Sequence, residues 1–199
     1  QLLTISIIPV GTLLFIVMLV VSYIFYVYGI LVHEAEQEWL ADRAYHDELC
    51  GTYNRTKCNE RFDELDAGNT EYALINMDLN GLKTINDSLG HVQGDLLLQE
   101  FAAILQDAFS GMGEVFRMGG DEFLVLVRQD QFPQIDQCLN KMVRLEKRRS
   151  SELTFNIEAA YGVAKSSECP KESAQKVYML ADKRMYEMKT KQKINQRLR

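Results

Sequence analysis

Three carboxylates occupy positions where strand-like segments end. Asp78 follows an apolar run at residues 72–77, and Asp121 and Glu122 lie in a glycine-containing turn between two further apolar runs. If that turn lies beside the strand ending at Asp78, the three side chains converge, which is unfavourable unless a cation offsets their repulsion. Hard oxygen ligands favour Mg²⁺ or Mn²⁺, ions that bridge carboxylates to substrate phosphates. These residues predict a metal and phosphate site, with a solvated polar hairpin tip as the alternative.

Two glycines and a lysine add phosphate-binding character. Gly119 and Gly120 directly precede Asp121. Glycine adopts positive φ in tight hairpin turns, lets the backbone approach a ligand closely, and can present N–H groups to phosphate oxygens. Lys83 follows Asp78 by five positions, close enough to reach the same phosphates. We therefore expect these three residues to bind substrate phosphates.

The elements that must position these residues alternate along the chain. We expect helices at residues 57–65, 82–89, 95–109, 134–148 and 174–191, and strands at residues 72–77, 115–118, 123–127 and 155–164. Residues 90–94 read as a loop after which Asp95 caps the next helix. This order predicts an α+β domain with a mainly antiparallel central sheet flanked by helices.

The first part of the chain has a different composition. From Leu2 to Val32 there is no Asp, Glu, Lys or Arg, and this run exceeds the roughly 20 residues that span a bilayer. A buried core helix would show a polar face, and a cleaved signal peptide would be shorter with a basic start. We expect a transmembrane helix at 1–32 and a connecting helix at 33–46, either a plain linker or a dimer stalk. We expect the domain at 47–199 to lie on the cytoplasmic side of the cell membrane, and its scattered cysteines fit such a reducing compartment.

Charge and cysteine content narrow the choice of partners. The formal net charge is −6, and because phosphate backbones require a basic surface, general nucleic-acid binding is not expected. A mononucleotide held by a few placed cations remains compatible with this charge. The four cysteines form no Cys-x-x-Cys pair, so a zinc site is not expected.

Five segments resemble the motifs of the GGDEF family of diguanylate cyclases. They lie in family order at residues 47–55, 78–95, 117–123, 161–164 and 181–189. The resemblance implies a nucleotidyl-cyclase palm-like fold at 47–199 and condensation of two GTP molecules into cyclic di-GMP plus pyrophosphate. It further implies a homodimer, with the membrane helix anchoring a signalling output. The alternative is a catalytically silent domain that binds GTP or cyclic di-GMP as a receptor or dimerisation module.

The resemblance also implies roles at the acidic positions. Asp78, Asp121 and the backbone carbonyl of Leu79 would hold Mg²⁺ or Mn²⁺. Glu122 would assist at the metal or near the ribose. Asp121 and Glu122 are thus the implied catalytic residues.

Substrate recognition is implied at five further positions. Asn86 and Asp95 would read guanine, and Asp95 can accept from both the N1–H and the exocyclic amine that adenine does not present together. Without the motif, Asn86 reads as a surface amide and Asp95 as a helix cap. Lys83, Lys189 and Lys193 would contact the triphosphate, although basic residues late in a helix also complement its dipole. The family usually has arginine where Lys193 stands.

Several positions depart from the family pattern. Cys50 and Thr52 replace the usual Thr and Leu of the opening turn, and Asn80 stands where many members have a second Asp. Product-inhibited members carry Arg-x-x-Asp shortly before the hairpin, where this chain has Ser110 and Gly113. Neither residue pairs with guanine and phosphate as Arg and Asp do, so we expect no product inhibition through that site.

Overall fold

The chain folds into two compact units, residues 1–44 and 45–199. The computed structural model describes the backbone of residues 2–197 and the side chains of residues 11–34, 36–37 and 43–194. Helix α1 (Leu2–Tyr45) makes up the first unit, and it continues without a break through residue 32. The division into a span and a connecting helix therefore remains a prediction.

Within α1, the segment Gly11–Glu34 is long and apolar enough to cross a membrane. No part of this segment is buried in the structure, whereas the core helix of a globular domain buries its apolar side chains. Length and composition thus fit the expected span.

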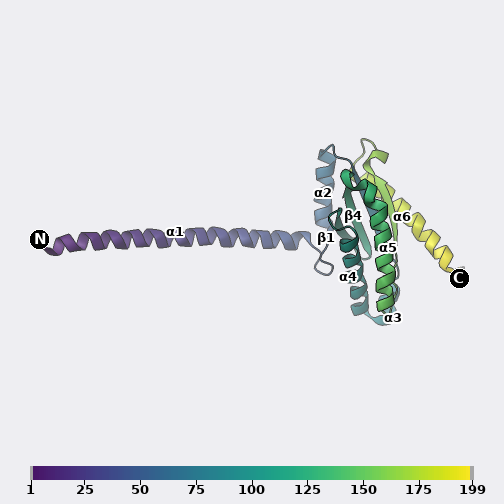
Figure 1. Ribbon diagram of the computed structural model, residues 1–199, viewed down its shortest axis with the longest axis horizontal. Coiled ribbons are helices and arrows are strands. Elements are labelled where there is room, and N and C mark those ends of the chain that lie inside the picture. Colours follow the sequence, from purple (N-terminus) through teal and green to yellow (C-terminus); the bar gives the residue numbers. More distant parts are fainter. Residues whose placement is uncertain (1, 198–199) are drawn as a thin grey trace. The chain divides into compact units, whose positions relative to one another are not determined.

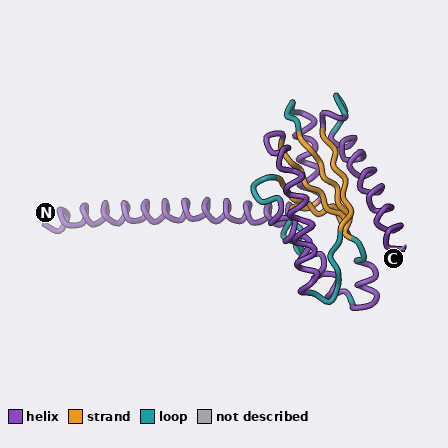
Figure 2. The backbone as a smooth tube through the Cα atoms, turned by 45° about the vertical axis from the view of Figure 1, so that its right-hand side comes forward, coloured by secondary structure: helices purple, strands orange, loops and turns teal. Residues whose placement is uncertain are grey.

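The second unit is built on a five-stranded sheet in the order β1-β3-β4-β2-β5. The strands are β1 (Tyr53–Asn54), β2 (Tyr72–Leu79), β3 (Gly113–Gly119), β4 (Glu122–Arg128) and β5 (Ala159–Lys165). Only the short β1–β3 pair is parallel, and the other three pairs are antiparallel. Figure 2 shows these strands as one twisted layer. The mainly antiparallel sheet is confirmed.

Helices cover both faces of the sheet (Figure 1). They are α2 (Arg55–Ala67), α3 (Leu82–Leu89), α4 (His91–Ala108), α5 (Ile135–Glu152) and α6 (Ala174–Arg197), with short 3₁₀ helices at Gln129–Gln134 and Ser166–Glu168. One core lies between the sheet and α3, α4 and α5, and the other lies between the sheet and α2 and α6. Every residue of β2 is buried, because alternate side chains such as Leu74 and Ile75 enter opposite cores. This explains its unbroken apolar sequence.

The prediction of a loop at residues 90–94 and a helix cap at Asp95 is wrong. Helix α4 begins at His91, directly after Gly90, whose φ of 87° separates it from α3. Gly94 is buried within the helix, and a Cβ there would lie 1.9 Å from Oδ1 of Asn86. Its glycine reflects close packing of α3 on α4 rather than a turn.

Several other element boundaries differ from expectation, most clearly in β5 and α6. Strand β5 begins at Ala159 rather than at residue 155, because the backbone N–H of Ile157 donates to Oγ of Ser150, 2.8 Å away, instead of joining the ladder. The apolar Phe155 and Ile157 are buried in the core outside the strand. Helix α6 continues beyond residue 191 to Arg197.

Candidate active site

The acidic hairpin lies beside the end of β2, which is the condition for the three carboxylates to converge. Asp78 is the register partner of Glu122 across the β2–β4 pair. The backbone N–H of Leu79 donates to the carbonyl of Asp121 at 2.9 Å. All three carboxylate residues are therefore carried to one edge of the sheet.

Two glycines shape the hairpin between β3 and β4. Gly119 pairs with Glu122 after a register shift, so the turn consists of Gly120 and Asp121. The φ angles of the glycines are 142° and 55°, values that L side chains rarely adopt. The glycine pair is therefore a conformational requirement of this turn.

Helix α6 supplies a cation to the same edge. Nζ of Lys189 lies 2.5 Å from Oδ1 of Asp78. The Asp78 residue is only 8% exposed, and a buried carboxylate without a partner is costly. Lys193, one helical turn later, is exposed. The structure thus brings one of the three predicted phosphate-binding lysines directly to the predicted metal ligand.

At the acidic edge of the sheet, the negative charge of Glu122 is unfavourable. Partial burial raises the pKa of this carboxyl, and the neighbouring carboxylates of Asp121, Asp78 and Asp182 raise it further, while Arg55 opposes them. A bound cation would relieve this repulsion.

The donor set fits a divalent metal chemically, since its oxygens are the ligands that Mg²⁺ and Mn²⁺ prefer. Among the described side chains, however, no group of three or more His, Cys, Asp or Glu residues is arranged to hold a metal ion. The carboxylate of Asp78 instead faces Lys189. Metal ligation by Asp78, Leu79, Asp121 and Glu122 therefore remains a prediction.

The predicted guanine-reading residues lie on α3 and α4, two helices that pack closely together. The side chain of Asn86 lies against Gly94, the residue directly before Asp95. Asn86 is half-buried, whereas Asp95 and Lys83 are exposed. The close helix contact therefore brings the Asn86 amide to the helical turn that carries Asp95.

Arg117 is a site-shaping residue for which the sequence pattern gave no role. Its Nε and Nη2 donate to the carbonyl of Gly120 at 3.2 and 2.9 Å, and its Nη1 donates to both carboxylate oxygens of Asp47. The available signal was an arginine two residues before the glycine pair. This guanidinium ties the hairpin to the turn that opens the domain.

A buried amide was also missed. Asn76 is fully buried within β2, and its Nδ2 donates to Oδ1 of Asp182 on α6 at 2.9 Å. The signal was one amide inside an otherwise apolar strand. This contact holds α6 against β2, the strand that carries Asp78.

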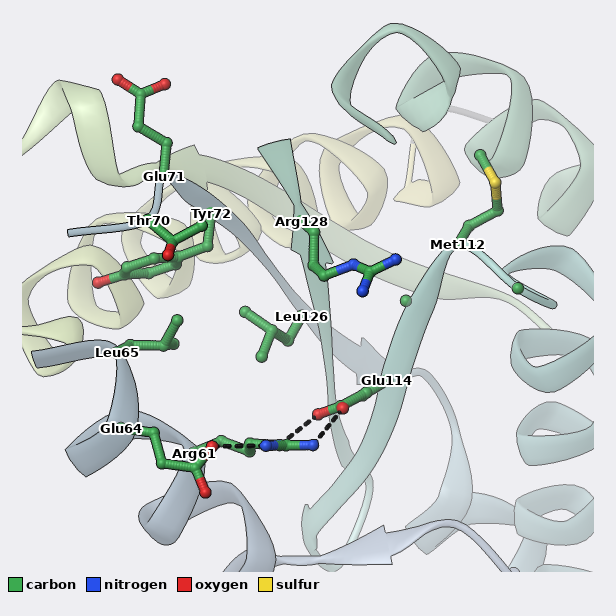
Figure 3. A pocket seen from close by; sticks show the side chains of 12 residues that line it. Arg61, Glu64, Leu65, Thr70, Glu71, Tyr72, Met112, Glu114, Leu126 and Arg128 are labelled. Carbon is green, nitrogen blue, oxygen red and sulfur yellow. Dashed lines mark hydrogen bonds and ion pairs between the residues drawn. The ribbon is translucent and has the colours of Figure 1, made fainter. Parts of the chain in front are cut away.

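A cavity lies at the opposite end of the sheet (Figure 3). It measures about 500 Å³ and is bordered by the start of β2 at Tyr72 and the end of β4 at Arg128. Figure 3 shows Arg61 between Glu64 and Glu114, to which it is ion-paired at 2.5 and 2.6 Å. Because Arg61 is already neutralised and the residues of the acidic hairpin do not line it, this cavity is not the predicted site.

An α+β domain with an acidic, glycine-containing hairpin beside a strand-end aspartate defines the GGDEF class of domain. The family model described as "Diguanylate cyclase, GGDEF domain" matches residues 44–195. The chain belongs to this family.

Related proteins carry the same assignment. Diguanylate cyclase DgcS of Shewanella oneidensis is 29% identical over 163 residues, which cover 80% of this chain and 54% of DgcS. Probable diguanylate cyclase DgcI of Escherichia coli is 31% identical over 147 residues, covering 73% of this chain and 31% of DgcI. The chain thus spans about half and a third of the lengths of these relatives.

A solved structure has the same fold. The coiled coil and GGDEF domain of DgcB from Caulobacter crescentus, in complex with c-di-GMP, superposes with a TM-score of 0.71 at 24% identity. The match covers 81% of this chain and 88% of that one.

Proposed function

We propose that this chain is an active diguanylate cyclase that joins two GTP molecules into cyclic di-GMP and releases two pyrophosphates. The carrying observation is the pairing of Asp78 with Glu122 in register, beside Asp121, with Lys189 against Asp78. A domain that has become a silent receptor has no need to keep both hairpin acids. The names of DgcS and DgcI support the same activity.

The acidic edge would hold the metal ions. Asp78, Asp121, Glu122 and the carbonyl of Leu79 supply oxygen ligands for Mg²⁺ or Mn²⁺. When bound, the metal lowers the pKa of the ribose 3′-hydroxyl and neutralises charge on the α-phosphate. The raised pKa of Glu122 supports this role, because burial and the neighbouring carboxylates both disfavour its negative charge, which a bound cation would offset.

The guanine would lie between α3 and α4. Asp95 accepts from the N1–H and amine of the base, and Asn86 contacts the same base from the facing helix. A site that depends on these hydrogen bonds rejects adenine, because its own polar groups would be left unpaired.

The triphosphate would extend from there toward the hairpin and α6. Gly119 and Gly120 allow the backbone to approach the phosphates, and Lys83, Lys189 and Lys193 supply positive charge. Positioning and charge stabilisation account for most of the rate in phosphoryl transfer.

The reaction needs two copies of the domain. Each domain holds one GTP, and the 3′-hydroxyl of each nucleotide attacks the α-phosphorus of the other as pyrophosphate leaves. A homodimer with facing sites therefore completes the active site. Helix α1 would anchor the pair in the cell membrane with the domains on the cytoplasmic side, where GTP is present.

The test is product formation by the full chain in detergent micelles or nanodiscs. The protein is incubated with GTP, ATP and Mg²⁺, and the products are identified by mass spectrometry. Cyclic di-GMP that disappears in Asp121→Ala supports the proposal. GTP binding without any turnover would favour the silent receptor, and an adenine-containing product would contradict the guanine assignment.

A further inference from the structure

One side chain joins the last helix to two strand ends. Nε2 of Gln192 donates to the carbonyl of Ala159 at 3.2 Å, and Oε1 of Gln192 accepts from Nδ2 of Asn80 at 3.1 Å. Asn80 directly follows β2, and Ala159 is the first residue of β5. Gln192 thus bridges α6 to the sheet edge that carries Asp78.

The direction of these two bonds is set by their partners. The carbonyl of Ala159 can only accept, so the amide nitrogen of Gln192 must face it and the amide oxygen is left for position 80. Position 80 must therefore donate, which asparagine does and an ionised aspartate cannot. The backbone N–H of Asn80 is held separately by the carbonyl of Glu158 at 2.9 Å.

The bridge fixes the last turns of α6 on the sheet, beyond the Asn76–Asp182 contact that holds its earlier turns. Gln192 lies three residues after Lys189 and one before Lys193, within the same turn of helix. Residues three apart share a helix face, so fixing Gln192 on the sheet also directs Lys189 toward Asp78, where the two charges lie 2.5 Å apart. Helix ends otherwise fray readily.

We infer that Gln192 and Asn80 form a positioning pair that holds Lys189 and Lys193 in place for the triphosphate. This inference rests on the proposed function for the identity of the ligand. The inference also assigns a role to Asn80, which is to donate the hydrogen bond that the Gln192 amide oxygen accepts. In this chain the aspartate common at that position in the family is not an equivalent replacement, because it removes the donor that Gln192 requires.

The test compares Gln192→Met, Asn80→Asp and their combination with Lys191→Met, all in the full chain. Methionine keeps the length and helix propensity of glutamine but removes both hydrogen bonds. Lys191 is an exposed neighbour on α6 and serves as the matched control. Binding is measured with 3′-deoxy-GTP, which cannot be condensed, and with guanosine, which has no phosphates. Hydrogen exchange of residues 186–194 is measured without ligand.

Each single variant is expected to bind 3′-deoxy-GTP about ten-fold more weakly, equivalent to about 1.4 kcal/mol, with guanosine binding unchanged. Hydrogen exchange in residues 186–194 becomes faster in each variant. The combined variant binds 3′-deoxy-GTP no more weakly than the single variant with the lower affinity, because both substitutions break the same bridge. Lys191→Met matches the unchanged protein in exchange.

Unchanged exchange and unchanged 3′-deoxy-GTP binding in Gln192→Met would overturn the inference, as would equal losses for guanosine. Absence of cyclic di-GMP from the unchanged protein would instead count against the proposed function. The exchange measurement still tests the bridge in that case, because it needs neither ligand nor turnover.

Discussion

Nζ of Lys189 lies 2.5 Å from Oδ1 of Asp78, so α6 neutralises the strand-end aspartate that is the expected metal ligand. The side chains are 22% and 12% exposed, and a hydrogen bond to a charged group in such surroundings contributes about 1.5–3 kcal/mol. In the absence of a bound metal ion, the Lys189 ammonium offsets the cost of burying the Asp78 carboxylate. When substrate binds, the metal would take Asp78 and the triphosphate would take Lys189, so both would compete with this ion pair.

Replacing Lys189 with methionine is expected to lower the thermal stability of the metal-free protein and to enlarge the rise in Tm caused by Mg²⁺. The reason is that the unpaired Asp78 gains its only compensation from the metal. Cyclic di-GMP formation falls at least about ten-fold, because a phosphate cation is lost. Thermal unfolding with and without Mg²⁺ measures the first effect. Lys183→Met, at an exposed position on α6, is the control, and identical Mg²⁺ shifts in all three proteins would contradict the prediction.

Arg117 should control the geometry of the hairpin. Its guanidinium holds the carbonyl of Gly120 and the carboxylate of Asp47 together, and lysine cannot reproduce this fork. Arg117→Lys is expected to destabilise the domain by about 1–2 kcal/mol and to lower kcat more than it raises KM. Urea unfolding and steady-state kinetics check both effects. Arg128→Lys, at an exposed site on the remote end of β4, should change neither quantity.

Gly94 should be intolerant of a side chain. A Cβ at this position would lie 1.9 Å from Oδ1 of Asn86, so Gly94→Ala must displace the amide or separate α3 from α4, at a cost of about 1–3 kcal/mol. We expect KM for GTP to rise and discrimination against ATP to fall. Gly29→Ala is the comparison, since a Cβ there meets nothing within 4 Å. Unaltered nucleotide discrimination in Gly94→Ala would count against the role of Asn86.

Glu146 should make stability depend on pH. This residue is 5% exposed, and burial raises the pKa of its carboxyl from 4.5 to about 8, with a backbone hydrogen bond from Ala159 acting in the opposite direction. Between about pH 4.5 and 8, the Glu146 carboxyl stays protonated in the folded state and is ionised in the unfolded state. Stability is therefore greatest below about pH 4.5 from this group and declines as pH rises toward 8.

Glu146→Gln is expected to remove this decline and to stabilise the domain at pH 8 by roughly 2–4 kcal/mol. Denaturant unfolding between pH 5 and 9 measures the slope. Glu152→Gln, an exposed substitution in the same helix, should keep it. A Glu146→Gln protein with the original slope would place the titrating group elsewhere.

We expect no inhibition by cyclic di-GMP through the motif positions Ser110 and Gly113 before the hairpin. A Cβ on Gly113 would lie 2.7 Å from the carbonyl of Leu126, so the aspartate of the inhibitory motif would not fit without moving β3 from β4. Initial rates measured with added cyclic di-GMP should show no inhibition that depends on Ser110. Tight inhibition that disappears in Ser110→Ala would show that the motif positions are misaligned.

The local sequence pattern predicted the structure correctly where a single strand or turn determines it. The apolar run ending at Asp78 became β2, and the glycine pair before Asp121 became a tight hairpin. It failed at Gly94, where glycine serves a helix–helix contact, and at residues 155–158, where apolar side chains enter the core without pairing. Local sequence does not distinguish a glycine required by φ from one required by a neighbouring helix.

The sequence by itself determined the family, the order of elements and the apolar α1, and it predicted which acidic, guanine-reading and basic residues form the candidate site. Only the tertiary structure decided that Lys189 meets Asp78, that Arg117 spans from Asp47 to Gly120, and that Gln192 reaches Asn80. These contacts join residues from different elements, many of them far apart in the chain. Their geometry depends on how α6 and the opening turn pack on the sheet, which no local periodicity records.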